Sequence, residues 1–302
     1  MEKYDIIIIG AGPAGLTAGI YAGRQGTSAL ILDKDAAGGK GREIAKMENY
    51  PGFKEISGSE LIDKMNDQMQ NTVLEEFNHV EAIAKIEEGE YNFKINTIKN
   101  TYLSKTLILT TGTIRKQLNV KGEEEFKGRG VSYCATCDGM FFKGKDIIVA
   151  GGGNTALEEA LFLNNLGCNV TIIHKKSKLK AEEFLQNKIT EKEIKVLLNT
   201  KIEEIKGEQI VSSVIIKKDS EVQEIPINGI FISEDYKPQN TLVKELNIEL
   251  DETNHIKTDK NQRTNIEYIY AAGDVCGGLK QWVVACAEGA IAATSAYEDL
   301  KI

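Results

Sequence analysis

Near its N-terminus the chain reads Asp5-Ile6-Ile7-Ile8-Ile9-Gly10-Ala11-Gly12-Pro13-Ala14-Gly15, an apolar run followed by a glycine-rich turn. The isoleucine run is typical of a strand buried in a parallel sheet. The turn has the spacing GxGxxG, and the small apolar residues of segment 16–22 predict a helix after it. A second apolar run, 28–32, ends at Asp33. Strand, turn, helix, strand and acid in this order predict a Rossmann-like unit that binds a dinucleotide.

Each part of this unit has a physical role. The glycines permit a tight turn and a close approach of the backbone, and the helix N-terminus faces a pyrophosphate. An acid at the end of the second strand can bind ribose hydroxyls, although such acids are also found simply solvated. The residues expected to bind FAD or NAD here are Gly10, Gly12, Pro13, Ala14, Gly15 and Asp33.

The pattern returns with an offset of 141 residues, from Gly10 to Gly151. The strand-like run 146–150 leads into Gly151-Gly152-Gly153-Asn154-Thr155-Ala156, so the chain holds an internal duplication of one unit. The second strand of this copy ends in His174-Lys175-Lys176, with Lys178 and Lys180 following. Cations at this position favour a nucleotide 2′-phosphate, whereas an acid favours a free hydroxyl. The second unit is therefore predicted to bind NADP; a solvated basic loop is the alternative.

A pair of cysteines precedes the second unit, in Ser132-Tyr133-Cys134-Ala135-Thr136-Cys137-Asp138-Gly139. Two cysteines at this spacing can close and reopen a disulfide, which suits two-electron redox chemistry. The alternative, half of a zinc site, needs a second ligand pair. The remaining cysteines, 168, 276 and 286, form no second pair of that spacing and are expected to be passive.

Composition narrows the function further. The 302 residues suffice for about two domains, and a net charge of −8 disfavours nucleic acid as a partner. No apolar run approaches the roughly 20 residues that span a bilayer. Because the chain shows no signal-peptide pattern and has an odd number of cysteines, five, we expect a cytoplasmic protein.

Taken together, these residues closely resemble the low-molecular-weight thioredoxin reductases over nearly the whole chain. The shared landmarks are segments 10–15, 48–52, 111–112, 134–139, 151–160 and 272–275. The sequence Cys-Ala-Thr-Cys-Asp, followed closely by GGGNTAxEEA, is highly specific to that family. The resemblance implies an α/β fold with two Rossmann-like three-layer dinucleotide-binding domains, the second inserted into the first.

The implied domains are an FAD-binding domain in two segments, 1–114 and 242–302, and an NADPH-binding domain, 115–241, which carries the dithiol. The resemblance also implies a homodimer and a thioredoxin disulfide as substrate. Electrons would pass from NADPH to FAD, then to the Cys134–Cys137 disulfide and on to thioredoxin. Cys137 is expected to face the flavin, Cys134 to attack thioredoxin, and Asp138 to transfer a proton.

The resemblance extends both cofactor sites. To the FAD site it adds Gly39, Asn49, Thr111, Gly112, Gly273, Asp274, Lys280 and Gln281. For NADPH the expected residues are Gly151, Gly153, Asn154, Thr155, Ala156, Glu159, His174, Lys175, Lys176 and Lys180.

Some positions depart from the family pattern. Lysines 175, 176 and 180 stand where the family usually has arginines, which removes the bidentate guanidinium forks. Glu234-Asp235 replaces a usual Ile-Gly, and Lys40 replaces a common glutamine. These departures leave open the same enzyme with ferredoxin or a deazaflavin as electron donor. A reductase of another dithiol carrier is a second, separate alternative.

Overall fold

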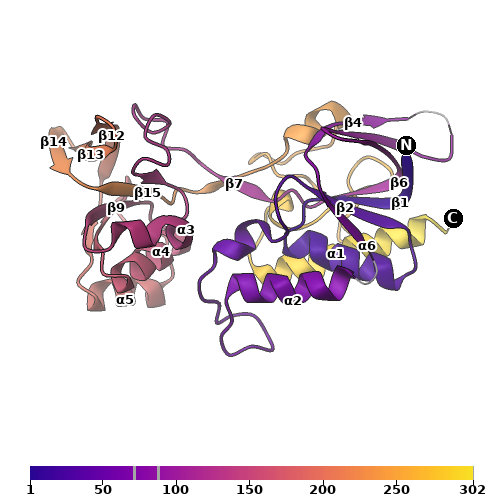
Figure 1. Ribbon diagram of the computed structural model, residues 1–302, viewed down its shortest axis with the longest axis horizontal. Coiled ribbons are helices and arrows are strands. Elements are labelled where there is room, and N and C mark those ends of the chain that lie inside the picture. The colour runs from indigo at the N-terminus through magenta and orange to yellow at the C-terminus, as the bar shows by residue number, and fades with distance from the viewer. Residues whose placement is uncertain (71–72, 87–88, 302) are drawn as a thin grey trace. The chain divides into compact units, whose positions relative to one another are not determined.

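The computed structural model describes residues 1–70, 73–86 and 89–301 (Figure 1). The chain forms two compact units, Met1–Ile114 with Pro238–Ile302, and Arg115–Lys237. The second unit is inserted into the first, so the chain crosses between them twice. Strands β7 (Thr113–Arg115) and β16 (Tyr236–Pro238) pair at these crossings. The second crossing therefore lies before residue 241, the expected last residue of the inserted domain. The predicted α/β fold with two Rossmann-like domains is confirmed.

The first unit is built on a seven-stranded sheet with the order β3-β2-β1-β6-β5-β4, and β17 pairs with β6. Strands β1, β2, β3, β6 and β17 run parallel, whereas β4 and β5 form an antiparallel ribbon beside β6. Their bounds are β1 Glu2–Ile9, β2 Ala29–Asp33, β3 Leu74–Phe77, β4 Val80–Lys85, β5 Phe93–Thr97, β6 Thr101–Leu109 and β17 Ile269–Ala271.

The predicted isoleucine strand is buried on both faces, because successive side chains of a strand point to opposite sides. Ile6 and Ile8 belong to the core shared with the helices, whereas Ile7 and Ile9 belong to the core on the opposite face. Full burial of each such side chain stabilises the fold by roughly 1.5–3 kcal/mol. The helices are α1 Pro13–Arg24, α2 Gly58–Gln70 and α6 Trp282–Asp299, with 3₁₀ turns η1 Gly39–Glu43, η3 Thr241–Leu246 and η4 Asp274–Cys276.

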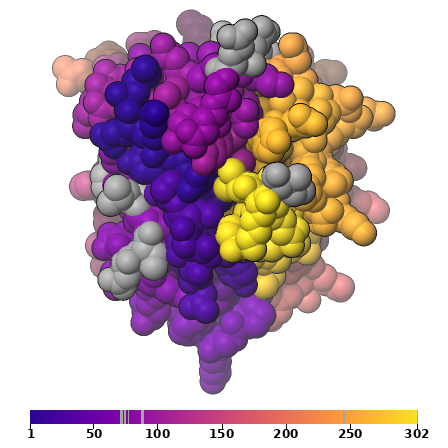
Figure 2. Space-filling view, turned by 90° about the vertical axis from the view of Figure 1, so that its right-hand side faces the viewer, coloured from indigo at the N-terminus to yellow at the C-terminus, as the bar shows by residue number. Residues whose placement is uncertain are grey.

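This unit joins both ends of the chain. Helix α6, near the C-terminus, packs along α1, and α1 also packs on α2. In the space-filling view the C-terminal segment (yellow) lies between the N-terminal segment (indigo) and the orange segment near residues 240–270 (Figure 2). The two sequence segments, which the inserted unit separates, therefore both contribute to the cores on the two faces of this sheet.

The second unit has a parallel five-stranded sheet of order β11-β10-β9-β15-β8. Its strands are β8 Val131–Ser132, β9 Asp146–Ala150, β10 Asn169–Ile173, β11 Lys195–Leu197 and β15 Gly229–Ile232. Ile147 and Val149 pack with the helices on one face, and Ile148 packs against a three-stranded antiparallel sheet on the other. The remaining elements are α3 Ala135–Asp138, η2 Gly139–Phe142, α4 Asn154–Asn165, α5 Glu183–Glu191, β12 Thr200–Gly207, β13 Val211–Lys218 and β14 Glu221–Pro226.

Within the described ranges, none of the helices combines the length and the apolar character that crossing a membrane requires.

Candidate active site

In the first unit, four predicted segments meet at one edge of the sheet. Strands β1, β2, β6 and β17 are mutually parallel, so their carboxyl ends lie at the same edge. The glycine turn follows β1, Asp33 ends β2, Thr111-Gly112 follows β6, and Gly273-Asp274 follows β17. In open α/β sheets this edge is where ligands bind.

The glycine turn after β1 combines close packing with an open space. A Cβ atom at Gly10, whose φ is +112°, would lie 2.3 Å from the Thr110 carbonyl oxygen. At Gly15 it would lie 1.8 Å from the Gly10 oxygen. A Cβ at Gly12 would meet nothing within 4 Å. Gly10 and Gly15 are therefore required by the fold, whereas Gly12 leaves room for a ligand to approach the backbone.

Hydrogen bonds hold the turn in shape. Asp33 Oδ2 accepts from the Ala11 amide at 2.7 Å, and the Ala11 carbonyl accepts from the Gly38 amide at 2.7 Å. No side chain caps helix α1, whose first turn contains the predicted residues Pro13 and Ala14. An uncapped helix N-terminus facing an open space fits a pyrophosphate group.

The remaining FAD candidates lie in the same unit. Lys40 Nζ lies 2.5 Å from Asp274 Oδ2 and 2.6 Å from Thr113 Oγ1. Asn49 donates to Gln281 Oε1 at 3.1 Å, and Lys280 is exposed. Three further candidates have the positive φ angles that glycine favours: Gly39 (+50°), Gly112 (+66°) and Gly273 (+81°). The hydroxyl of Thr111 donates to the Gln239 carbonyl at 2.6 Å.

The second glycine turn repeats this construction. A Cβ at Gly151 would lie 2.2 Å from the Ser233 carbonyl oxygen, and one at Gly153 would meet nothing within 4 Å. Helix α4 begins without a side-chain cap, and its first turn contains Asn154, Thr155 and Ala156. The Asn154 side chain donates to Glu182 Oε1 at 2.9 Å and accepts from the Glu182 amide at 2.8 Å.

The predicted 2′-phosphate cations are not equivalent in the structure. The side chain of His174 is buried, at 6% exposure, and a Cβ at Gly152 would touch its ring. Burial lowers the pKa of His174, so the ring is neutral at neutral pH. Lys175 Nζ lies 2.8 Å from Glu234 Oε2, and Lys180 Nζ lies 3.7 Å from Asp235 Oδ2. The lysine segment therefore carries positive charge that acids partly neutralise.

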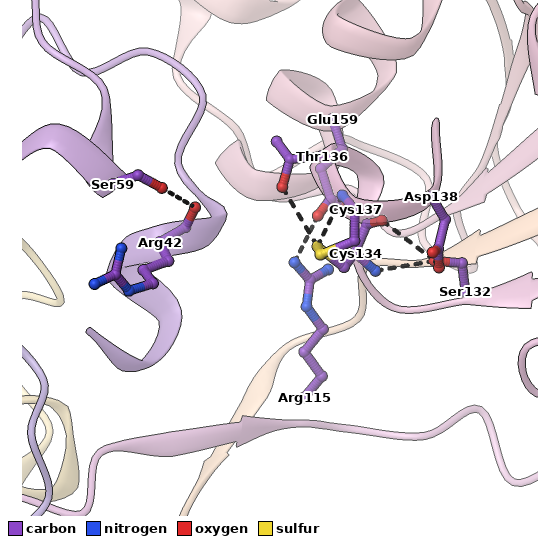
Figure 3. The surroundings of a disulfide bond; sticks show 9 residues. All are labelled: Arg42, Ser59, Arg115, Ser132, Cys134, Thr136, Cys137, Asp138 and Glu159. Atoms are coloured by element: carbon purple, nitrogen blue, oxygen red, sulfur yellow. Dashed lines mark hydrogen bonds and ion pairs between the residues drawn. A yellow bond between two sulfur atoms is a disulfide. The ribbon is translucent and has the colours of Figure 1, made fainter. Parts of the chain in front are cut away.

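Cys134 and Cys137 form a disulfide, with their Cα atoms 5.3 Å apart. The Cys137 amide donates to Cys134 Sγ at 3.2 Å, and Thr136 Oγ1 lies 3.3 Å from the same sulfur (Figure 3). Hydrogen bonds directed at a sulfur favour its thiolate form. Two groups that can donate a hydrogen bond therefore lie at Cys134 Sγ.

An acid is linked to this pair through one hydroxyl group. Ser132 Oγ donates to Asp138 Oδ2 at 2.6 Å and accepts from the Cys134 amide at 3.1 Å (Figure 3). Both contacts arise because α3 follows β8 after only two residues and turns the chain back on itself. A carboxylate in this position can hold or release a proton beside the sulfurs.

Comparison with known proteins agrees with these two turns and the disulfide. The model of the pyridine nucleotide-disulphide oxidoreductase family matches residues 4–289. The thioredoxin reductase of Peptoclostridium litorale is 41% identical over 99% of this chain and 97% of its own length. The chain belongs to the thioredoxin reductases of this family.

Solved structures of the family agree closely with the fold. The thioredoxin reductase of T. acidophilum has a TM-score of 0.94 at 40% identity and covers 100% of both chains. That of Lactococcus lactis has the same TM-score and identity and covers 99% of this chain and 100% of its own.

In this member of the thioredoxin reductase family, the Glu159 carboxylate binds the side chains of Arg115 and Ser233. Arg115 Nη2 lies 2.5 Å from Glu159 Oε1, and the Ser233 hydroxyl donates to the same carboxylate. Both charged side chains are nearly buried, at 8% and 12% exposure. Glu159 therefore ties α4 to the end of β15 and to β7, a role that sequence reasoning missed because Arg115 lies in no recognisable motif.

The other three cysteines differ from the dithiol. Burial raises the pKa of the thiols of Cys168, Cys276 and Cys286, so they stay protonated and poorly nucleophilic at neutral pH. Among the residues that the structure describes, no three His, Cys, Asp or Glu side chains group as a metal ion would require.

Proposed function

We propose that the chain is a flavoprotein disulfide reductase that passes electrons from NADPH, through FAD and the Cys134–Cys137 pair, to thioredoxin. The observation that carries the proposal is a disulfide in the same unit as one dinucleotide-type turn, with a second such turn in the other unit. The name of the relatives, thioredoxin reductase, supports thioredoxin as the acceptor. We further propose a cytoplasmic homodimer.

The first unit, with its two sequence segments, would bind FAD. When bound, FAD would supply the hydride-transfer chemistry that links a nicotinamide to a dithiol, which amino-acid side chains lack. The open space at Gly12 and the uncapped α1 N-terminus fit its pyrophosphate. The residues that would hold it are Gly10, Gly12, Pro13, Ala14, Gly15, Asp33, Gly39, Asn49, Thr111, Gly112, Gly273, Asp274, Lys280 and Gln281.

The inserted unit would bind the pyridine nucleotide at its own uncapped helix N-terminus, beside Gly153. The residues that would hold NADPH are Gly151, Gly153, Asn154, Thr155 and Ala156, and the segment with Lys175, Lys176 and Lys180 would lie beside the ribose. We assign Glu159 and His174 to positioning the turn, since Glu159 binds Arg115 and His174 packs under Gly152.

The dithiol chemistry follows from the hydrogen bonds around the pair. In the reduced enzyme the Cys134 thiolate attacks one sulfur of the acceptor disulfide, forms a mixed disulfide and releases the other sulfur as a thiolate. Cys137 then attacks Cys134 Sγ, which restores the Cys134–Cys137 disulfide and releases the acceptor as a dithiol. Asp138 takes up and returns the protons of these thiols. The enzyme pair loses two electrons, and the acceptor gains them.

Replacing Asp138 with asparagine removes this proton carrier while keeping a hydrogen-bond acceptor for Ser132. We expect kcat with thioredoxin to fall by about a hundredfold. The flavin content should stay unchanged, because the substitution lies in the other unit. The measurement is steady-state thioredoxin reduction across pH. An unchanged rate and pH profile would show that Asp138 carries no proton.

The test of the nucleotide site is Gly153→Val. Since a Cβ there meets nothing within 4 Å, and the backbone is extended (φ −97°), the fold should tolerate valine. We expect NADPH to bind on the order of a hundredfold more weakly, because the side chain fills the approach to the backbone. Anaerobic bleaching of the flavin by NADPH should slow accordingly, while dithionite still reduces it.

A second candidate keeps the flavin and dithiol but takes electrons from ferredoxin or a deazaflavin. The observation that favours it is the pairing of Lys175 and Lys180 with acids. If NADPH leaves the wild-type flavin oxidised while dithionite bleaches it, this candidate replaces NADPH as the donor.

A further inference from the structure

Two segments far apart in sequence meet beside the second glycine turn. Lysines 175 and 180 follow β10, whereas Glu234 and Asp235 follow β15. Strand β9 lies between β10 and β15 and runs parallel to both, so all three carboxyl ends lie at one edge. The Gly151 turn follows β9, which places lysines and acids on either side of it.

The two ion pairs differ in strength. Glu234 Oε2 lies 2.8 Å from Lys175 Nζ, and the Glu234 side chain is only 14% exposed. Asp235 Oδ2 lies 3.7 Å from Lys180 Nζ, with both side chains more than half exposed. Because solvent screens exposed pairs strongly, the Glu234 pair is the stronger one.

The lysine segment is fixed in place by its backbone. The amides of Lys180 and Ala181 both donate to the Gly152 carbonyl, at 2.7 Å and 3.2 Å. The cations therefore stay beside the glycine turn, and so do the acids that pair with them. His174 is buried beneath Gly152 and neutral, so it adds no positive charge. Across the described ranges, exposed Lys176 takes part in no ion pair.

We propose that Glu234, assisted by Asp235, keeps Lys175 and Lys180 in intramolecular ion pairs, so that a nucleotide 2′-phosphate contributes little to binding. The proposal rests on the proposed function only for the location of the nucleotide. A 2′-phosphate that binds Lys175 and Lys180 would have to displace a carboxylate from both and then lie next to that negative charge. Lysine also lacks the fork with which arginine binds phosphate bidentately. The site therefore distinguishes poorly between phosphorylated and unphosphorylated ribose.

The experiment compares two probes on the full-length flavin-loaded protein by titration calorimetry: 2′,5′-ADP, which carries the phosphate, and 5′-AMP, which does not. In the wild type we expect their affinities to differ by less than about fivefold. Glu234→Gln should raise the affinity for 2′,5′-ADP about tenfold, and Asp235→Asn about twofold. Affinity for 5′-AMP should stay within about twofold. Glu208→Gln, exposed between β12 and β13, is the matched control and should change neither probe.

Lys175→Gln tests whether the increase in 2′,5′-ADP affinity in Glu234→Gln depends on Lys175. It should cost little in the wild type and abolish the gain in the Glu234→Gln background, a coupling that a general change of surface charge would not produce. Glu234→Ile, which places an apolar side chain at this position of 14% exposure, serves if the glutamine variant unfolds.

The proposal is overturned by a wild-type preference above a hundredfold for 2′,5′-ADP, by an unchanged ratio in both Glu234 variants, or by failure of all variants to bind either probe. Thioredoxin reduction by dithionite-reduced enzyme tests the proposed function separately, since it needs no nucleotide.

Discussion

Replacing Cys134 or Cys137 with serine should lower thioredoxin reduction at least about a thousandfold, because no other thiol can complete the disulfide exchange. The remaining three cysteines are held as thiols by burial, so none substitutes for the lost one. Bleaching of the flavin by the electron donor should persist in both variants. The measurement is donor-dependent thioredoxin turnover, together with the flavin absorbance under anaerobic conditions.

The two serine variants should differ in one respect. Cys137→Ser leaves Cys134 with the Thr136 hydroxyl and the residue-137 amide directed at its sulfur, so it should trap thioredoxin as a mixed disulfide. Cys134→Ser should trap far less. Cys168→Ala is the matched control, because Cys168 is buried in the same unit and should leave turnover within about twofold. Trapping by Cys134→Ser instead would reverse the assigned roles, and normal turnover in either variant would refute the dithiol mechanism.

Gly12→Val should yield a folded but colourless protein, with FAD affinity reduced more than about a hundredfold. The backbone at Gly12 is extended (φ −76°, ψ −174°) and a Cβ there meets nothing within 4 Å, so valine obstructs only an approaching ligand. The measurements are flavin absorbance per protein and the melting temperature with excess FAD removed.

Gly10→Ala is the contrasting variant, because it should impair folding, whereas Gly12→Val should impair only FAD binding. Its Cβ would lie 2.3 Å from a backbone oxygen at a φ of +112°, so we expect a destabilised protein rather than a folded apoprotein. Gly153→Val should keep its flavin and so controls for a general effect of valine in such turns. A yellow Gly12→Val protein with wild-type flavin content would remove the first glycine turn from the FAD site.

The repeated strand, turn and helix were predictable from the sequence for a local reason. Apolar runs, glycine spacing and the acid at Asp33 are patterns over fewer than about forty residues, and each pattern favours a particular local backbone conformation. The redox disulfide followed from the spacing of Cys134 and Cys137, and the family and its α/β fold followed from the resemblance that these motifs carry together; all three are confirmed. The roles of the individual cofactor residues stay predictions.

Only the tertiary structure determined which charges meet. Lys40 pairs with Asp274, and Lys175 with Glu234, because parallel strands distant in sequence end at the same edge of a sheet. From the sequence alone we predicted that the lysines after β10 bind a phosphate and noted that Glu234 departs from the family pattern, but no local pattern joins the two. The positions of the lysines could be read from a local stretch of sequence, whereas the acids that pair with them could not. Electrostatic interactions depend on distance in space, and the order of strands in the folded sheet sets that distance.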